Sequence, residues 1–192
     1  MCDRTHHRHP TRRTVLATGA ALGAAALAGC TGGPATGTPE PVALTANQAC
    51  DVCGMVIQKH PGPNGEIFYE NERPEGHDNP ARFDSLKQCL FPYRLEHERM
   101  GWTAAAVYVT DYSSVSYSVS GEGDTPVISS HPEAEAFAPA EDLHYVVGSD
   151  VEGAMGPDFV PFSDREDATA FAGEYGGEIL AYGEIDEGVI GK

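Results

Sequence analysis

Two stretches of the chain repeat one spacing of apolar residues, and this repeat constrains the fold more than any other feature. In each stretch, apolar side chains occupy positions i, i+3, i+4 and i+7, which gives a helix one apolar face. The first set is Leu86, Cys89, Leu90 and Tyr93, and the second is Ala168, Phe171, Ala172 and Tyr175. The first helix should follow Asp84-Ser85 and be kinked or divided at Pro92, which lacks an amide proton. Ser163 should cap the second helix, and Gly176-Gly177 should end it.

Runs of β-branched and aromatic residues flank both predicted helices. They lie at residues 55–57, 66–69 and 102–109 around the first helix, and at 144–147, 159–162 and 178–182 around the second. The chain is therefore predicted to be an α+β protein with two β-β-α-β units in tandem, over about 49–112 and 143–186. Both units should belong to one domain spanning 49–192, with residues 112–142 left unassigned.

The first 29 residues are typical of an export signal. Arg12-Arg13 resemble a twin-arginine motif, and the uncharged run from Val15 to Gly29 is short and only weakly apolar for a spanning helix. Leu27-Ala28-Gly29-Cys30 resembles the box at which lipoproteins are cleaved, which would leave Cys30 as a lipidated N-terminus. We therefore expect an exported protein anchored to the outer face of the cytoplasmic membrane. An uncleaved anchor helix is the alternative.

A flexible tether is predicted over residues 30–48, because this segment is rich in Gly, Pro and Thr and has no apolar periodicity. A flexible chain of this length has a root-mean-square reach of about 20–25 Å. The folded part could thus meet a partner while its N-terminus stays at the membrane.

The chain without residues 1–29 is strongly acidic, because its 8 basic and 28 acidic residues give a net charge of −20. Such a surface resembles that of halophilic proteins, which stay soluble in high salt because salt screens self-repulsion. An acidic face for a cationic partner or metal is the alternative. Nucleic acid is not expected as a partner, because phosphate binding needs a basic patch.

Three cysteines remain after the lipidation box, namely Cys50, Cys53 and Cys89, and an odd number argues against a pure disulfide framework. If a strand begins at Cys53, the side chains of Cys53 and Met55 lie on one face, with Gly54 leaving the backbone open between them. Thiolate and thioether sulfurs are soft ligands, which favour Cu(I). The segment therefore predicts a Cu(I) site.

Two alternatives to copper remain for the Cys50-x-x-Cys53 motif. A structural zinc site would need a second pair of ligands, for which only scattered histidines are available. A thiol-disulfide oxidoreductase normally places such a pair at the start of a helix, whereas Met55-Val56-Ile57 has the composition of a strand.

Cys89 and Met155 each allow a structural and a metal-binding interpretation. Cys89 lies where the second helix has Phe171, so a buried and inert thiol is expected, with metal ligation as the alternative. Met155 lies in a Gly-rich turn of the second unit, at a place comparable to Met55 in the first. It would supply a third soft donor, or else serve as filler.

These motifs together resemble the NosL family, which comprises lipoprotein copper chaperones for nitrous-oxide reductase. The resemblance covers residues 49–186 and rests on Cys50-x-x-Cys53-Gly54-Met55, the strand at 145–149, Met155-Gly156 and the segment 171–180. It implies two β-β-α-β units, similar in shape to part of organomercury lyase, and one Cu(I) held by Cys53, Met55 and Met155. The chain departs from the family at Ala154, where proline is usual, and a ligand role for Cys50 is not implied.

The sequence as a whole is interpreted as a membrane-tethered Cu(I) chaperone and not as an enzyme. The resemblance implies that it supplies copper to the proteins that assemble the copper centres of nitrous-oxide reductase. The sequence shows no obvious Ser/His/Asp arrangement, phosphate loop or paired-carboxylate motif. Asp84-Ser85 and the histidines are expected to be helix-capping and surface groups.

Overall fold

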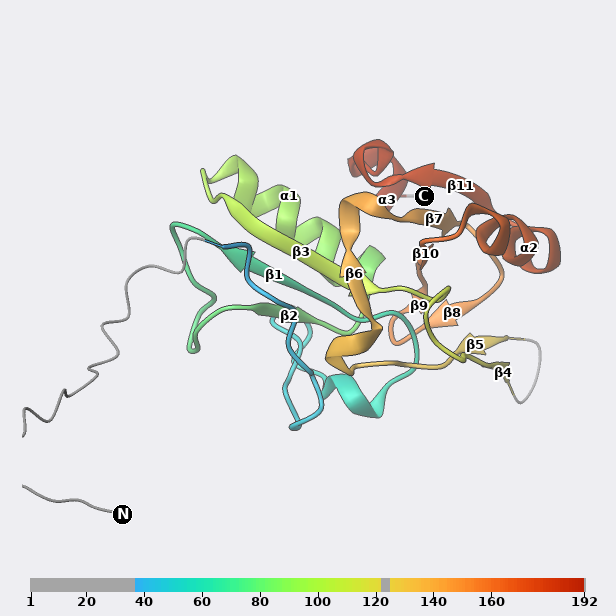
Figure 1. The fold of residues 1–192 in the computed structure, drawn as a ribbon, viewed down its shortest axis with the longest axis horizontal. Helices are drawn as coiled ribbons and strands as arrows, with labels where there is room; N and C mark the ends of the chain where they lie inside the picture. Colours follow the sequence, from blue (N-terminus) through green and yellow to red (C-terminus); the bar gives the residue numbers. More distant parts are fainter. Residues whose placement is uncertain (1–36, 122–124, 192) are drawn as a thin grey trace, which may run out of the picture. The chain divides into compact units, whose positions relative to one another are not determined.

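The repeat seen in the sequence is present in the fold as two antiparallel sheets of the same strand order. In the first sheet β1 (Gly65–Tyr69) lies between β2 (Ala81–Phe83) and β3 (Ala104–Thr110). In the second, β7 (His144–Val147) lies between β10 (Val160–Phe162) and β11 (Glu178–Ala181). The structure, a computed structural model, describes residues 37–121 and 125–191 (Figure 1). The prediction of an α+β fold with two β-β-α-β units in tandem is confirmed.

The first helical segment begins with one π-helical turn, Leu86–Leu90, and continues as α1 (Phe91–Arg99). Ser85 caps its start by accepting a hydrogen bond from the Gln88 amide at 3.1 Å. Pro92 lies in the first turn of α1, where a missing amide proton is tolerated, so the segment is divided near Pro92 as predicted. A β-carbon on Gly65 would lie 2.4 Å from Leu90 Cδ1, so this glycine allows the helix to approach β1 closely.

The second helix, α2 (Arg165–Tyr175), ends as predicted at Gly176, whose φ of 75° suits glycine. Its cap was predicted wrongly. Asp164 accepts the Glu166 amide at 2.7 Å, whereas the Ser163 hydroxyl donates to buried Asp111 at 2.7 Å. A tertiary hydrogen bond to Asp111 thus takes up the side chain that local sequence favoured as the cap.

Residues 55–57 were predicted to be a strand, and this prediction is wrong. They form one isolated bridge, Ala49 to Val56, followed by the 3₁₀ turn Ile57–Lys59. The Lys59 amide donates to the Val56 carbonyl at 3.0 Å, and the buried Ile57 packs into the core from this turn. The second strand of the first unit is instead the three-residue β2, too short to stand out in the sequence.

The unassigned central region contributes to two sheets. β6 (Phe137–Pro139), between the 3₁₀ turns Ala134–Ala136 and Ala140–Asp142, adds to the first sheet beside β3. β4 (Val119–Ser120) and β5 (Val127–Ile128) form a small sheet with β8 (Glu152–Gly153) and β9 (Gly156–Pro157). The chain then ends, after β11, with the 3₁₀ turn Tyr182–Glu184 and α3 (Glu187–Ile190).

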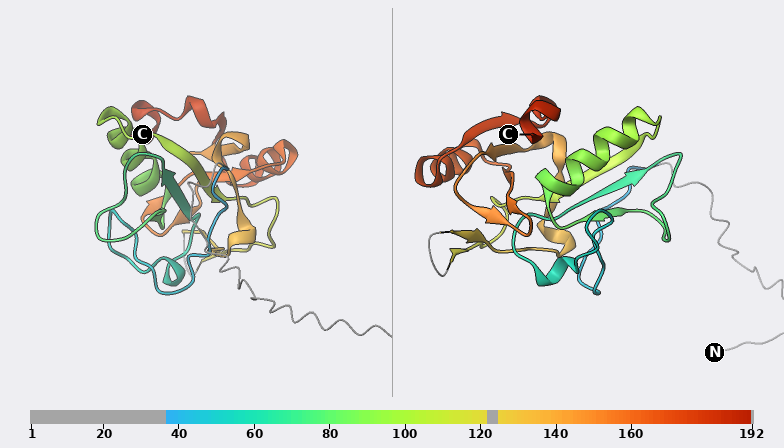
Figure 2. Two further views of the ribbon diagram at one scale, coloured as in Figure 1. Left: turned by 60° about the vertical axis from the view of Figure 1, so that its left-hand side comes forward. Right: turned by 180° about the vertical axis from the view of Figure 1, so that it is seen from behind.

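Residues 37–48, predicted to belong to the flexible tether, lie against the first sheet, so that part of the prediction is wrong. The Tyr108 hydroxyl donates to the Pro39 carbonyl at 2.7 Å, and the Val42 amide donates to Glu66 Oε1 at 2.9 Å. Leu44 is fully buried, which fixes the segment by removing apolar surface from water. Figures 1 and 2 show this segment on the sheet face opposite α1. The predicted signal, Cys30 and the first part of the tether lie outside the described residues.

The two units share one hydrophobic core at the start of α1. Phe91 is fully buried, and its ring lies 5.7 Å from the ring of Tyr145 and 5.8 Å from that of Phe159, both from the second unit. A separate apolar cluster lies under α2 and includes Phe162 and Phe171. Among the described residues, no helix is long and apolar enough to cross a membrane.

Candidate metal centre

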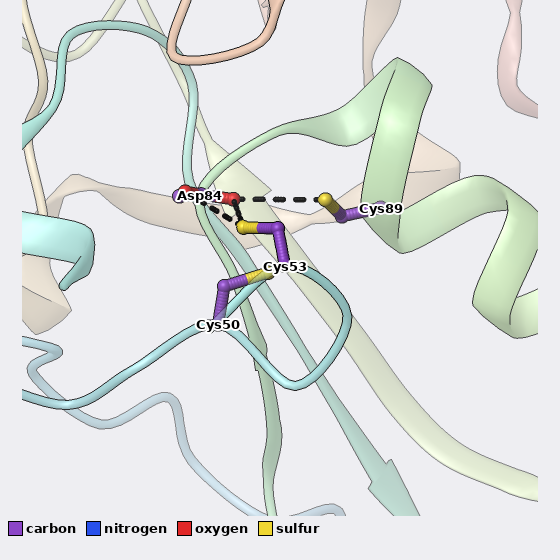
Figure 3. A group of neighbouring side chains, drawn as sticks. All are labelled: Cys50, Cys53, Asp84 and Cys89. Carbon is purple, nitrogen blue, oxygen red and sulfur yellow. Dashed lines mark hydrogen bonds between the residues drawn. The ribbon is translucent and has the colours of Figure 1, made fainter. Parts of the chain in front are cut away.

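Three thiols and one carboxylate meet beside β2 (Figure 3). The sulfur atoms of Cys50, Cys53 and Cys89 and a carboxylate oxygen of Asp84 all lie within 4.8 Å of one another. Cys50, Asp84 and Cys89 are buried, and Cys53 is partly exposed. We call these four residues the thiol cluster. No other group of three or more His, Cys, Asp or Glu ligands with this proximity occurs within residues 37–121 and 125–191.

A tight turn brings Cys50 and Cys53 together. The Gly54 amide donates to the Cys50 carbonyl at 2.9 Å, and the Cys50 amide donates to the Met55 carbonyl at 2.9 Å. Gly54 has a φ of 75°, which residues with a β-carbon rarely adopt. Cys53 therefore closes a turn and does not begin a strand. The prediction that strand alternation places the side chains of Cys53 and Met55 on one face is wrong.

Asp51 fixes this turn to β2. Its amide donates to the Arg82 carbonyl at 2.9 Å, and its Oδ2 accepts the Arg82 amide at 2.7 Å. Its other oxygen, Oδ1, lies 2.8 Å from Nε2 of His77. The turn is therefore held in place by the same strand that leads directly to Asp84.

Asp84 and Cys89 complete the cluster from the other side. Asp84 follows β2, and Cys89 lies in the π-helical turn that begins two residues later. Cys53 Sγ is 3.3 Å from both Asp84 oxygens, and Cys89 Sγ is 3.6 Å from Oδ1. The expected burial of Cys89 is confirmed. Asp84 was expected to be a capping or surface group, and this is wrong because Asp84 is buried with its oxygens facing Cys53 and Cys89, whereas Ser85 accepts the Gln88 amide as the cap.

The three thiols differ in pKa because their surroundings differ. A hydrogen bond from Cys89 lowers the pKa of Cys50 from 9.0 to about 7, with further help from the amides of Cys53, Asp84 and Val52. Burial raises the pKa of Cys53 to about 12. The pKa of Cys89 is also raised, chiefly because its proton is held in the hydrogen bond to Cys50. The cluster thus holds one sulfur close to the thiolate form, the form that binds metals.

Neither of the two predicted methionine ligands belongs to the thiol cluster. Met55 is half-buried and follows the turn directly, whereas Met155 lies between β8 and β9 and is 41% exposed. The β8–β9 segment reaches the first unit at both ends. A β-carbon on Gly62 would lie 2.5 Å from Gly153 Cα, and Asp158 Oδ1 accepts the amides of Leu86 and Lys87 at 3.1 and 2.8 Å.

Asp84 was not predicted to belong to the site, and Cys89 was expected to be a structural thiol, with metal ligation as the alternative. The only signal for Asp84 was its position just before a predicted helix, a position that is also common for simple caps. Proximity to Cys53 depends on how the turn packs on β2, which the local sequence does not specify.

The known proteins to which this chain is similar carry the name of one family. The NosL family model matches residues 41–190. The chain is similar to the Copper-binding lipoprotein NosL of Stutzerimonas stutzeri, with 29% identity over 151 residues covering 79% of this chain and 68% of the relative. The corresponding protein of Achromobacter cycloclastes is 30% identical, with coverages of 78% and 69%. The crystal structure of the copper chaperone NosL from Shewanella denitrificans is also similar, with a TM-score of 0.61 and 30% identity over 78% of this chain and 98% of that one.

Proposed function

The chain belongs to the NosL family, and on that premise we propose that it is a Cu(I) chaperone tethered to the outer face of the cytoplasmic membrane. The observation that carries the proposal is the thiol cluster, which gathers soft donors at one point. Its role would be to bind copper and pass it to the proteins that assemble the copper centres of nitrous-oxide reductase. The names of the relatives, copper-binding lipoproteins, support the copper binding and the membrane tether.

We assign Cys53, Met55 and Met155 as the copper ligands from which the ion is delivered. Cys53 is the one cluster thiol that is not fully buried, and Met155 is exposed. The contacts of Gly153 and Asp158 hold the Met155 segment against the first unit near the helix that carries Cys89. Three soft donors at low coordination number suit Cu(I), and the exposure of two of them suits exchange with a partner's sulfur or imidazole groups.

Anaerobic metal analysis tests the proposal against its alternatives. Stoichiometric Cu(I) in the reduced protein supports the chaperone, and tight Zn(II) would support a structural zinc module. No metal with rapid disulfide exchange would support an oxidoreductase. The structure disfavours the last, because the Cys50–Cys53 turn leads into an isolated bridge and a 3₁₀ turn and does not open a longer helix.

Replacing Met155 with leucine tests whether the second unit contributes to the site. Leucine preserves volume and apolarity, so the free energy of unfolding should change by less than about 1.5 kcal/mol. Transfer of Cu(I) to an external chelator should slow, because the delivery position loses one of its three sulfur donors. Met100→Leu, at a position that is 58% exposed after α1, is the matched control and should leave the transfer rate unchanged. An unchanged transfer rate in Met155→Leu would place the delivery site within the first unit alone.

The membrane anchor is a separate part of the proposal and rests on the lipidation box ending at Cys30. Cys30→Ser should remove the lipid and release the exported protein from membranes, because acyl burial provides the binding energy. The measurement is the amount of parent and of variant protein that stays with cell membranes after a carbonate wash. If the variant stays with the membranes as fully as the parent, the anchor is of another kind.

A further inference from the structure

Cys50 and Cys89 are two buried thiols that the proposed delivery site does not use. We propose that they form a second, interior position for the Cu(I) ion, next to the outer position formed by Cys53, Met55 and Met155. This inference rests on the proposed function and concerns the same ion. It gives the protein a holding position inside the first unit and a delivery position at its surface.

The spacing of the sulfur atoms suits a two-coordinate soft ion. A metal–thiolate bond is about 2.3 Å, taking zinc as the guide, so two sulfurs on opposite sides of an ion lie about 4.6 Å apart. The ligand atoms of the thiol cluster are all within 4.8 Å of one another. Because 4.8 Å is an upper limit for every pair, no two of these sulfurs lie too far apart to bind one ion after rotation of their side chains.

Charge decides how many thiols bind in the interior. Two thiolates and one Cu(I) leave a single negative charge, whereas three thiolates would leave two negative charges beside the buried Asp84. Unpaired buried charge is costly. The favoured arrangement binds Cu(I) between Cys50 and Cys89, releases their two protons to solvent, and leaves Cys53 protonated and hydrogen-bonded to Asp84 at 3.3 Å.

The surroundings of Cys50 support a bound thiolate. Its sulfur lies in the tight turn that the Gly54 amide closes, and backbone groups of this turn and of Asp84 also lower the pKa of Cys50 without adding a cation. Cys89 approaches from the π-helical turn on the other side, as Figure 3 shows. The negative charge of a two-thiolate complex is therefore placed where the backbone already provides donors.

Cys53 provides the route between the two positions. It lies three residues from Cys50 in the same turn and is partly exposed, so it can replace one interior sulfur while the ion remains bound to the other. Its proton then leaves and the displaced thiol is reprotonated, so charge is conserved. Exchange of the remaining interior sulfur for Met55 and Met155 would complete the movement to the outer position, and that displaced thiolate would take up one proton from solvent.

The thiolate count in the full-length parent tests the inference without any substitution. Sulfur and copper X-ray absorption, recorded on the reduced protein with one equivalent of Cu(I), should show two thiolates bound to copper. A single thiolate together with thioethers would overturn the interior position and leave the chaperone proposal intact. A parent that binds no Cu(I) would overturn both.

Substitution of the interior thiols gives an independent measurement. Cys50→Ser and Cys89→Ser should each speed removal of Cu(I) by a chromogenic chelator by about tenfold or more, equivalent to about 1.4 kcal/mol of barrier. The hydroxyl introduced by Cys89→Ser can still donate to Asp84, and Met100→Leu is the control with unchanged kinetics. Folded variants that lose copper at the parent rate would overturn the inference. If either variant fails to fold, the thiolate count in the parent decides.

Discussion

Cys53→Ser is expected to slow the transfer of Cu(I) from the protein to an external acceptor by about a hundredfold or more, equivalent to about 2.7 kcal/mol of barrier. Cys53 is the thiol of the proposed delivery site and lies beside the interior thiols in the thiol cluster, so no other single substitution should slow delivery as much. A hydroxyl is a hard and poor ligand for Cu(I), although it is close in size to a thiol. The fold should therefore survive.

The measurement is the rate of anaerobic Cu(I) transfer to a chromogenic chelator, together with thermal unfolding of the metal-free proteins. Met100→Leu again provides a matched control, because its side chain is mostly exposed and lies outside both sulfur motifs. A folded Cys53→Ser protein that transfers Cu(I) at the parent rate would refute the assignment of this residue and with it the proposed delivery site.

The metal-free protein is expected to lose stability as the pH rises from about 5 to 7. Burial raises the pKa of Glu66 from 4.5 to about 7 and that of Asp158 from 3.8 to about 7. Both carboxyl groups have a higher pKa in the folded protein than in the unfolded chain. The stability that their protonated forms provide is therefore complete below the unfolded pKa and is lost as the pH rises through the folded pKa of about 7. Between these two pKa values, each group can lower the free energy of unfolding by up to about 1.4 kcal/mol per pH unit.

The structural cause is that each carboxyl has one oxygen without a hydrogen-bond partner among the described residues, namely Glu66 Oε2 and Asp158 Oδ2. The other oxygen of Glu66 accepts the Val42 amide, and that of Asp158 accepts the amides of Leu86, Lys87 and Phe159. Ionisation therefore leaves negative charge on a buried, unpaired atom.

Denaturant unfolding at pH 5.5 and 7.0 in high salt gives the test, because salt screens the repulsion of the acidic surface. The double variant Glu66→Gln, Asp158→Asn is the control, since an amide resembles the protonated acid and should flatten the pH dependence. Measurements stay at or below pH 7. Above that pH the lowered pKa of Cys50 makes the folded state more stable as the pH rises, which would oppose the loss from Glu66 and Asp158. Equal pH slopes for parent and double variant would refute this explanation.

Much of the fold followed from the sequence because helix and strand periods are local properties. The apolar spacing from Leu86 to Tyr93 and from Ala168 to Tyr175 predicted both helices, and Gly176 marked the end of the second. Long β-prone runs such as 102–109 and 144–147 predicted their strands. The equal order of elements then predicted the duplication, since the same local pattern occurs twice in one chain.

The surroundings of the sulfur atoms were decided only by tertiary structure. The composition of residues 55–57 suited a strand that could begin at Cys53, but Gly54 at positive φ and the hydrogen bonds of Asp51 to β2 make the segment around Cys53 a turn. That turn places Cys53 against Asp84, 31 positions later in the chain. Cys89 had the expected apolar environment, yet its helix also carries its sulfur to the other side of Asp84.

The sequence by itself therefore determined both long helices, the longer strands, the duplication, the soft donors and the acidic composition, each of which depends on neighbouring residues or on residue counts. Only the tertiary structure decided which donors meet. A thiol cluster requires side chains from a turn, a strand end and a helix to converge within a few ångströms. That convergence depends on packing between segments far apart in the chain, and local periodicity carries no information about it.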